Sequence, residues 1–131
     1  MAHDRRGGIM KLIQHHYAEK AYQHVMNAKT NEENFSNQYG QLCHRFASMI
    51  LTNGLRLTIT FFEAKSKKGN AYQQFVQDIK ETLDIQGDWS ASNRDYLIKS
   101  RQALSASVWL KRYAESILKV EQGAEDVEDI Q

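Results

Sequence analysis

The longest stretch without a helix-breaking residue lies near the end of the chain. Residues 93–121 contain neither proline nor glycine, and the whole sequence of 131 residues contains no proline. Asp95 lies near the positive end of the expected helix dipole, and Gly123 follows the other end. At about 1.5 Å per residue, such a helix extends about 43 Å, which is longer than a small domain is wide. The stretch therefore predicts a long helix around which the other segments pack.

The two faces of this predicted helix differ in chemistry. One carries a broad apolar band that we expect to be buried against other helices. The other carries four cations separated by seven, eleven and seven residues, spacings close to whole helical turns, so they lie on one narrow stripe bordered by Trp109. A solvated face is the simpler interpretation of the stripe, and contact with a nucleic-acid strand is the functional one. The band consists of Leu97, Ala103, Leu104, Val108, Leu110, Ala114, Ile117 and Leu118, and the stripe of Arg94, Arg101, Arg112 and Lys119.

Other segments carry the period of a helix as well. Residues 9–29 predict an amphipathic helix, and a second one should end at Asn53-Gly54. Residues 55–61 alternate as a strand does, but they also follow helical spacing, and a lone strand would leave its backbone groups unpaired, so we predict a helix there. A further helix should run from Asn70 to near Gly87. The prediction is an all-α, single-domain bundle of five or six helices with a long C-terminal helix.

Charge divides the chain unevenly. Its net charge is +1, but residues 1–121 hold all 17 lysines and arginines and 12 of the 16 acidic residues, which gives this part +5. We predict a flexible basic arm over residues 1–8, the helical bundle over residues 9–122 and a disordered acidic tail over residues 123–131. A mildly basic body is compatible with a polyanionic partner. No apolar run has the length of a membrane span and the start has no apolar signal segment, so we expect a cytoplasmic protein.

The sequence contains no motif for catalysis, metal binding or cofactor binding. It lacks a P-loop, a dinucleotide-binding fingerprint and a nucleophile elbow. His15 and Glu19 are one helical turn apart, but two ligands do not make a metal site, and a histidine-based ribonuclease would need a second converging acid or base. We expect Cys43 to be buried and inert. The residues alone leave the function open between a helical scaffold and a protein that contacts nucleic acid.

Two stretches resemble a known protein family. NGLRLTITFFEAKSKK (residues 53–68) is similar to the asparagine-glycine-leucine element, followed by an aromatic residue and a lysine, of the small (fifth-numbered) subunit of the type III-B CRISPR-associated Cmr (RAMP module) effector complex. YLIKSRQALSASVWLKRYAESIL (residues 96–118) resembles the closing helix of that family, with its tryptophan-leucine-lysine-arginine run. The resemblance covers residues 10–121. It implies an all-helical subunit without catalysis, stacked along the backbone of an RNA-guided complex whose larger subunits cut the target.

The resemblance and the residue pattern together predict RNA contacts. Four cations match the family's pattern, and the others come from the helical stripe and from the lysines that precede Gly69. Such side chains pair with phosphates without reading bases, because sequence is read by pairing between guide and target. The first group is Arg56, Lys65, Lys111 and Arg112, and the second is Lys67, Lys68, Arg94, Arg101 and Lys119.

The implied partners are other Cmr subunits, further copies of this chain, the guide RNA and the target RNA, with no membrane and no cofactor. We expect Trp109 to contribute to contacts between subunits through exposed apolar area. Two alternatives remain open. In the first, the chain is the equivalent small subunit of a type III-A complex. In the second, it is a helical protein–protein adaptor with no role in RNA binding.

Overall fold

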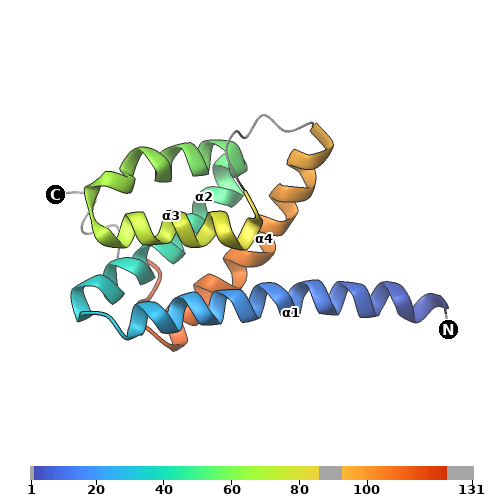
Figure 1. The fold of residues 1–131 in the computed structure, drawn as a ribbon, viewed down its shortest axis with the longest axis horizontal. Coiled ribbons are helices and arrows are strands. Elements are labelled where there is room, and N and C mark those ends of the chain that lie inside the picture. The colour runs from blue at the N-terminus through green and yellow to red at the C-terminus, as the bar shows by residue number, and fades with distance from the viewer. Residues whose placement is uncertain (1, 86–92, 124–131) are drawn as a thin grey trace.

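The computed structural model describes residues 2–85 and 93–123, and the side chains of residues 15–85 and 95–123. These parts form four α-helices and one short 3-10 helix, with no strand (Figure 1). The all-α prediction is confirmed, and so is the helical assignment of residues 55–61, whereas the expected number of five or six helices is wrong. In chain order the elements are α1 (Ala2–Lys29), α2 (Glu33–Lys65), η1 (Ser66–Lys68), α3 (Asn70–Leu83) and α4 (Asn93–Ser116).

One kinked helix replaces two predicted ones. Gly54 interrupts α2 with φ 82° and ψ 171°, a backbone conformation with positive φ that glycine adopts readily. The helix resumes at once, and the Thr58 hydroxyl donates a hydrogen bond to the Gly54 carbonyl at 2.6 Å. The helix end predicted at Asn53-Gly54 is an interruption in the structure, because residues 33–53 and 55–65 form a single kinked element.

The first and last helices also differ from their predicted bounds. α1 extends to Ala2, ahead of the periodic pattern that starts at Ile9. α4 ends at Ser116, five residues before the predicted end, and Lys119 follows with a left-handed φ of 60°. The Val120 amide then donates to the Ala114 carbonyl at 3.0 Å, so the chain reverses against the end of the helix. Residues 124–131 of the predicted tail lie outside the described residues, and the division into arm, bundle and tail stays a prediction.

The core is built from aromatic rings of α2 and α3. Phe75 lies at its centre, with ring centroids 5.3 Å from Tyr39, 5.7 Å from Phe46 and 5.3 Å from Phe62. All four side chains are fully buried. Edge-to-face and offset contacts of this kind add to the stabilisation from apolar burial alone. Figure 1 shows α4 crossing the bundle beside both α1 and α2, so these two helices cover the sides of α4.

α4 faces the core with small side chains, and this corrects part of the predicted apolar band. Ala103, Leu110, Ala114 and Leu118 are buried, as predicted. Ala103 and Ala114 are fully inaccessible, which lets the helix axis approach its neighbours closely. The larger members of the band on the adjoining face are exposed instead of buried: Leu97 is 55% exposed, Leu104 37% and Val108 45%. In the described part of the chain, no helix is long and apolar enough to cross a lipid bilayer.

Candidate nucleic-acid and protein interface

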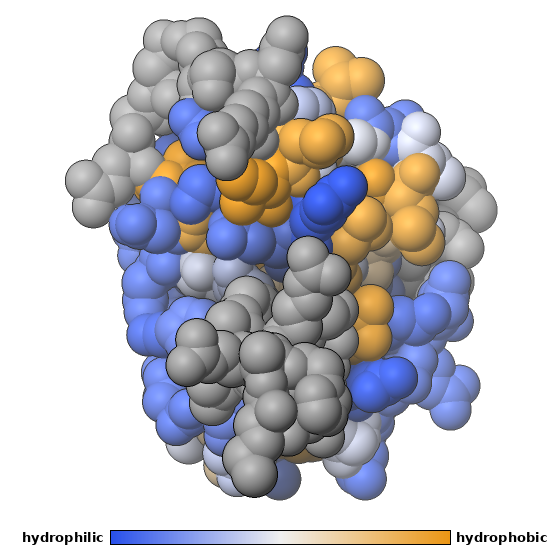
Figure 2. Space-filling view, turned by 90° about the vertical axis from the view of Figure 1, so that its right-hand side faces the viewer, coloured by the Kyte–Doolittle hydropathy of each residue, from blue (hydrophilic) through white to orange (hydrophobic). Residues whose placement is uncertain are grey.

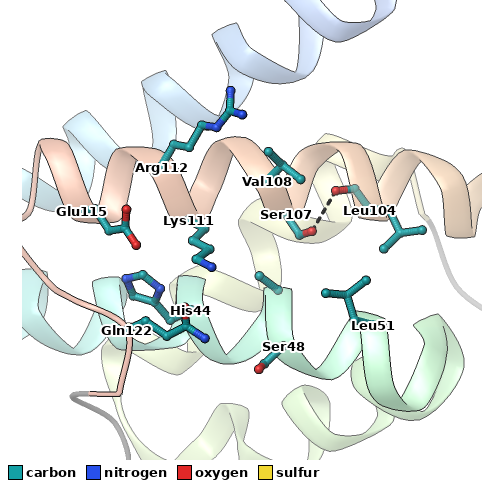
Figure 3. Close-up of a pocket in the computed structure, with 11 residues that line it drawn as sticks. His44, Ser48, Leu51, Leu104, Ser107, Val108, Lys111, Arg112, Glu115 and Gln122 are labelled. Carbon is teal, nitrogen blue, oxygen red and sulfur yellow. Dashed lines mark hydrogen bonds between the residues drawn. The ribbon is translucent and has the colours of Figure 1, made fainter.

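The exposed side of α4 carries a ridge between two hollows. Leu104, Val108 and Arg112 are four residues apart and form this line along the helix, which we name the α4 ridge. The larger hollow, the α2–α4 groove, has a volume of about 460 Å³, and the smaller, the Trp109 hollow, about 340 Å³. Ser105 and Trp109 line the smaller one together with the ridge. The groove is lined by the ridge and by His44, Ala47, Ser48, Leu51, Ser107, Lys111, Glu115 and Gln122 (Figure 3).

The two ends of the α2–α4 groove differ in chemistry. At one end, Leu51 of α2 and Leu104 of α4 face each other across the opening, and Leu51 is 77% exposed (Figure 3). At the other end, Lys111 points from α4 toward His44. The His44 ring is buried and its Nε2 lies 2.7 Å from the Val120 carbonyl oxygen, so this histidine holds the chain reversal after α4. The groove therefore joins an apolar end to a charged end.

The Trp109 hollow combines a cation with stacked aromatic rings. The Arg112 guanidinium lies 5.0 Å from the centroid of the Trp109 ring, within the range of a cation–π contact. The indole stacks on Tyr113 at 5.9 Å, and Tyr113 meets Tyr22 of α1 edge-on at 5.6 Å. Trp109 packs against the core on one side and remains partly exposed on the other. Its role between subunits stays a prediction.

The predicted RNA-contacting cations fall into two separate groups. Arg101, Lys111 and Arg112 lie together on α4, with Arg101 and Arg112 both exposed. Lys119 does not continue their stripe, because α4 ends before it. The side chain of Arg94, at the other end of the stripe, is outside the described residues.

Arg56 joins α2 to the first part of α4. Its guanidinium lies 4.5 Å from the centroid of the Tyr96 ring, and its backbone amide donates to the Tyr96 hydroxyl at 3.2 Å. These contacts fix the position of the arginine next to the helix that carries Arg101. Arg56, which the family resemblance predicted, thus lies on a helix that contacts α4, the helix that carries the stripe.

The second group lies at the connection between α2 and α3, on the other side of the bundle from the start of α4 (Figure 1). Lys67 and Lys68 are exposed in η1, and the Lys65 ammonium lies 4.6 Å from the Phe61 ring centroid. Partial burial lowers the pKa of Lys65, and the positive charges of Lys68 and Arg45 lower it further. This group is locally crowded with positive charge.

Within residues 15–85 and 95–123, the predicted RNA-contacting cations form no ion pair with a carboxylate. Between described side chains, the ion pairs are Lys20–Glu81 at 3.1 Å, Lys80–Glu63 at 2.7 Å and contacts of His24 with Asp78 and Glu81. None of these involves a predicted RNA contact. Arg101, Lys111 and Arg112 therefore present their charge without a carboxylate partner in residues 15–85 and 95–123.

A polar network that no sequence motif indicated is buried among α1, α2 and α3. Asp78 is its centre: it accepts hydrogen bonds from the Tyr39 hydroxyl at 2.5 Å and from the Gln74 amide at 2.8 Å, and it lies 3.3 Å from Nδ1 of His24. Burial raises the pKa of Asp78, although these partners counteract it. Burial also raises the pKa of Tyr39 well above its ordinary value. These residues belong to different helices and meet only when the helices pack, so no local spacing in the sequence predicts the network.

Three side chains in and beside this network are of the types that bind metal ions. Ligand atoms of His24, Asp78 and Glu81 lie within 4.8 Å of one another. Both oxygens of Asp78 already accept hydrogen bonds, and Lys20 binds Glu81. The carboxylates thus have protein partners, and we interpret the group as part of the hydrogen-bonded core.

Comparison with known proteins decides the family. A family model described as "CRISPR-associated protein (Cas_Cmr5)" matches residues 13–117. The chain belongs to the CRISPR-associated Cmr5 family. Its relatives include the "CRISPR system Cmr subunit Cmr5" of Thermus thermophilus, which is 24% identical over 110 residues, 79% of this chain and 93% of that protein. No solved structure matches the chain significantly. The Cmr5 match contains the whole α4 ridge and leaves residues 118–131 outside it.

Proposed function

We propose that this Cmr5-family chain is a non-catalytic small subunit of a type III-B RNA-guided Cmr effector complex. In this proposal it stacks along the backbone of the complex and contacts phosphates of the guide or target RNA. The family match over residues 13–117 is the observation that carries the assignment. The name of the Thermus thermophilus relative, a Cmr subunit, supports other Cmr subunits as partners of this chain.

The cations on α4 support the RNA contact. Arg101 and Arg112 are separated by eleven residues, three helical turns, so they point to the same side about 16 Å apart along the helix. Contact with Trp109 restricts the Arg112 guanidinium to a defined direction, which reduces the entropy lost when it binds a phosphate. Contacts of this type are independent of base sequence and sensitive to salt. They suit a subunit that lies beside a strand whose sequence is read by pairing.

The lysine group at η1 supports a second phosphate contact. Lys65 and Lys68 repel each other electrostatically, which is one cause of the lowered pKa of Lys65. A bound polyanion would relieve this repulsion. The lysines of η1 and the cations of α4 belong to different elements, so we treat them as two separate phosphate contacts.

Exposed apolar residues beside the cations support contacts between subunits. Leu51, Leu104 and Val108 all line the α2–α4 groove and are at least 37% exposed. Figure 2 shows that apolar side chains reach the surface in groups on one face of the molecule. Clustered apolar residues with a polar rim are typical of protein interfaces.

Purification of the tagged chain from cells that carry its complex tests the proposal. We expect larger Cmr subunits and a short guide RNA to accompany it, and the purified chain alone to leave RNA uncut. Nuclease treatment before purification separates the proposal from the adaptor alternative. An adaptor would retain the same protein partners in both preparations and bring no guide RNA, whereas a type III-A subunit would bring the subunits of that complex.

A further inference from the structure

The α2–α4 groove has walls that the described chain leaves uncovered. Leu51 is 77% exposed, and Val108 on the opposite wall is 45% exposed. Lys111 and Arg112 stand beside this apolar surface without a carboxylate partner in residues 15–85 and 95–123. An occupant that fits must therefore offer apolar side chains and negative charges within one short segment.

The chain itself leaves the bundle at the edge of this groove. His44 fixes the Val120 carbonyl, and Gln122 is one of the residues that line the charged end (Figure 3). Gly123 follows with φ 100°, a conformation that permits a sharp change of direction. The described chain therefore ends next to Gln122, which lines the groove together with Lys111 and Glu115.

Residues 124–131 combine the apolar side chains and the negative charges that fit the groove. Their sequence, AEDVEDIQ, contains four carboxylates and no cation, with two large aliphatic residues three positions apart. Val127 and Ile130 match the apolar wall, and Glu125, Asp126, Glu128 and Asp129 match the cations. Along α4 the groove runs from Glu115 to Leu104, about 16 Å, and eight extended residues reach about 26 Å.

We propose that residues 124–131 dock in the α2–α4 groove of the same molecule. Val127 and Ile130 lie toward Leu51 and Leu104, and the carboxylates lie near Lys111 and Arg112. Glu115 is the one carboxylate among the groove residues, and it lies at the same end of the groove as Gln122 and His44. The segment passes it with Ala124, before its own charges begin.

Tethering makes even a weak contact effective. A segment joined to the groove edge by one or two residues experiences an effective concentration of about 1 mM or more, so a dissociation constant of about 1 mM fills the groove about half of the time. A docked tail would shield Lys111 and Arg112 from other polyanions and cover the exposed ridge. This inference goes beyond the proposed function and does not depend on it, since it concerns one chain alone.

Paramagnetic broadening in the full-length chain tests the contact. Burial raises the pKa of the single natural thiol, Cys43, so a nitroxide reagent should react selectively with a Gln131→Cys variant. With the nitroxide at position 131, we expect the amide signals of four groove residues to lose at least about half of the intensity that they have when the label is reduced. This loss follows from a groove that the tail occupies about half of the time. The four residues are Leu51, Leu104, Val108 and Lys111. In the same chain, replacing the four tail carboxylates by their amides should restore most of the intensity.

Two controls make the result decisive. A nitroxide at Gln73→Cys, an exposed position near the start of α3, should leave these signals unchanged. Mixing labelled protein without ¹⁵N and unlabelled protein with ¹⁵N detects contact between molecules. Broadening that is confined to residues next to Gly123, or that occurs equally in the mixed sample, would overturn the proposal.

Discussion

The side chain of Val120 occupies the space directly above Gly40. A Cβ atom added to Gly40 would lie 2.6 Å from Cγ2 and 2.7 Å from Cβ of Val120, closer than real contacts allow. One helical turn further along α2, His44 contacts the Val120 carbonyl oxygen. Gly40 and His44 thus form the surface of α2 against which the chain reversal after α4 packs. This contact fixes the end of α4, the helix that carries the ridge, relative to the groove wall.

Gly40→Ala should destabilise the protein despite the better helix propensity of alanine. The substitution gains about 1 kcal/mol of propensity. Displacing Val120 costs more, because overpacking a filled site typically costs about 1 to 3 kcal/mol. We expect the free energy of unfolding in chemical denaturation to fall by about 1 kcal/mol. In a Val120→Gly background the same substitution should become neutral or stabilising. An increase in stability in the natural background would contradict the packing described here.

Asp78 should give the stability an unusual dependence on pH. Its folded pKa is raised above the ordinary value of 3.8, mainly because the carboxyl is buried. Its contribution to stability is therefore fully present below that ordinary value and is lost as pH rises through the folded pKa. The free energy of unfolding, measured relative to Asp78→Asn, should be larger near about pH 3 than near about pH 7.

Glu81 provides the control of opposite sign. The hydrogen bond from Lys20 lowers the pKa of Glu81, so its contribution is present above the ordinary value of 4.5 and is lost as pH falls. Relative to Glu81→Gln, stability should therefore rise with pH, and the change should be small because the side chain is exposed. If both differences changed in the same direction, the description of the Asp78 network would be wrong.

Val108→Lys should weaken assembly with partner subunits while leaving the isolated chain folded. Val108 is 45% exposed on the α4 ridge, so the unfolding free energy should change by no more than about 0.5 kcal/mol. Loss of an apolar anchor at an interface should reduce the affinity for partner subunits by about tenfold, equivalent to about 1.4 kcal/mol. Leu57→Lys is the matched control, because Leu57 is 64% exposed but lines neither hollow. Equal effects of the two variants would remove the ridge from the interface.

Periodicity predicted which segments are helical, and packing decided how they face one another. The spacing of apolar residues identified α1, α3 and both parts of α2, because burial of one stripe is what makes these segments helical. The same pattern misjudged the orientation of α4. Leu104 and Val108 of the band are exposed, whereas its two alanines are fully buried because small side chains permit the closer approach. Leu110 and Leu118 are buried beside these alanines. Sequence spacing does not encode that choice.

The candidate site was predictable in its components and less so in its arrangement. The eleven-residue spacing of Arg101 and Arg112 follows from helix geometry, and both lie exposed on α4. Lys119 was placed on the same stripe because no breaker precedes it. In the structure it has a left-handed φ of 60° and is followed by Val120, whose carbonyl contacts His44. The α2–α4 groove and the buried Asp78 network each join residues of different helices. Such contacts appear only when the helices are assembled.

We propose that the cations of α4 hold RNA phosphates in the assembled complex. The most direct test of this proposal is the salt dependence of target-RNA binding by complexes that contain Arg101→Gln with Arg112→Gln. As a control of equal charge change, Lys29→Gln with Lys80→Gln alters cations outside the predicted set. Loss of two phosphate contacts should make the slope of log affinity against log salt shallower by about 1.4, while the control leaves it unchanged. An unchanged slope in the Arg101 and Arg112 variant, with the complex intact, would contradict the account.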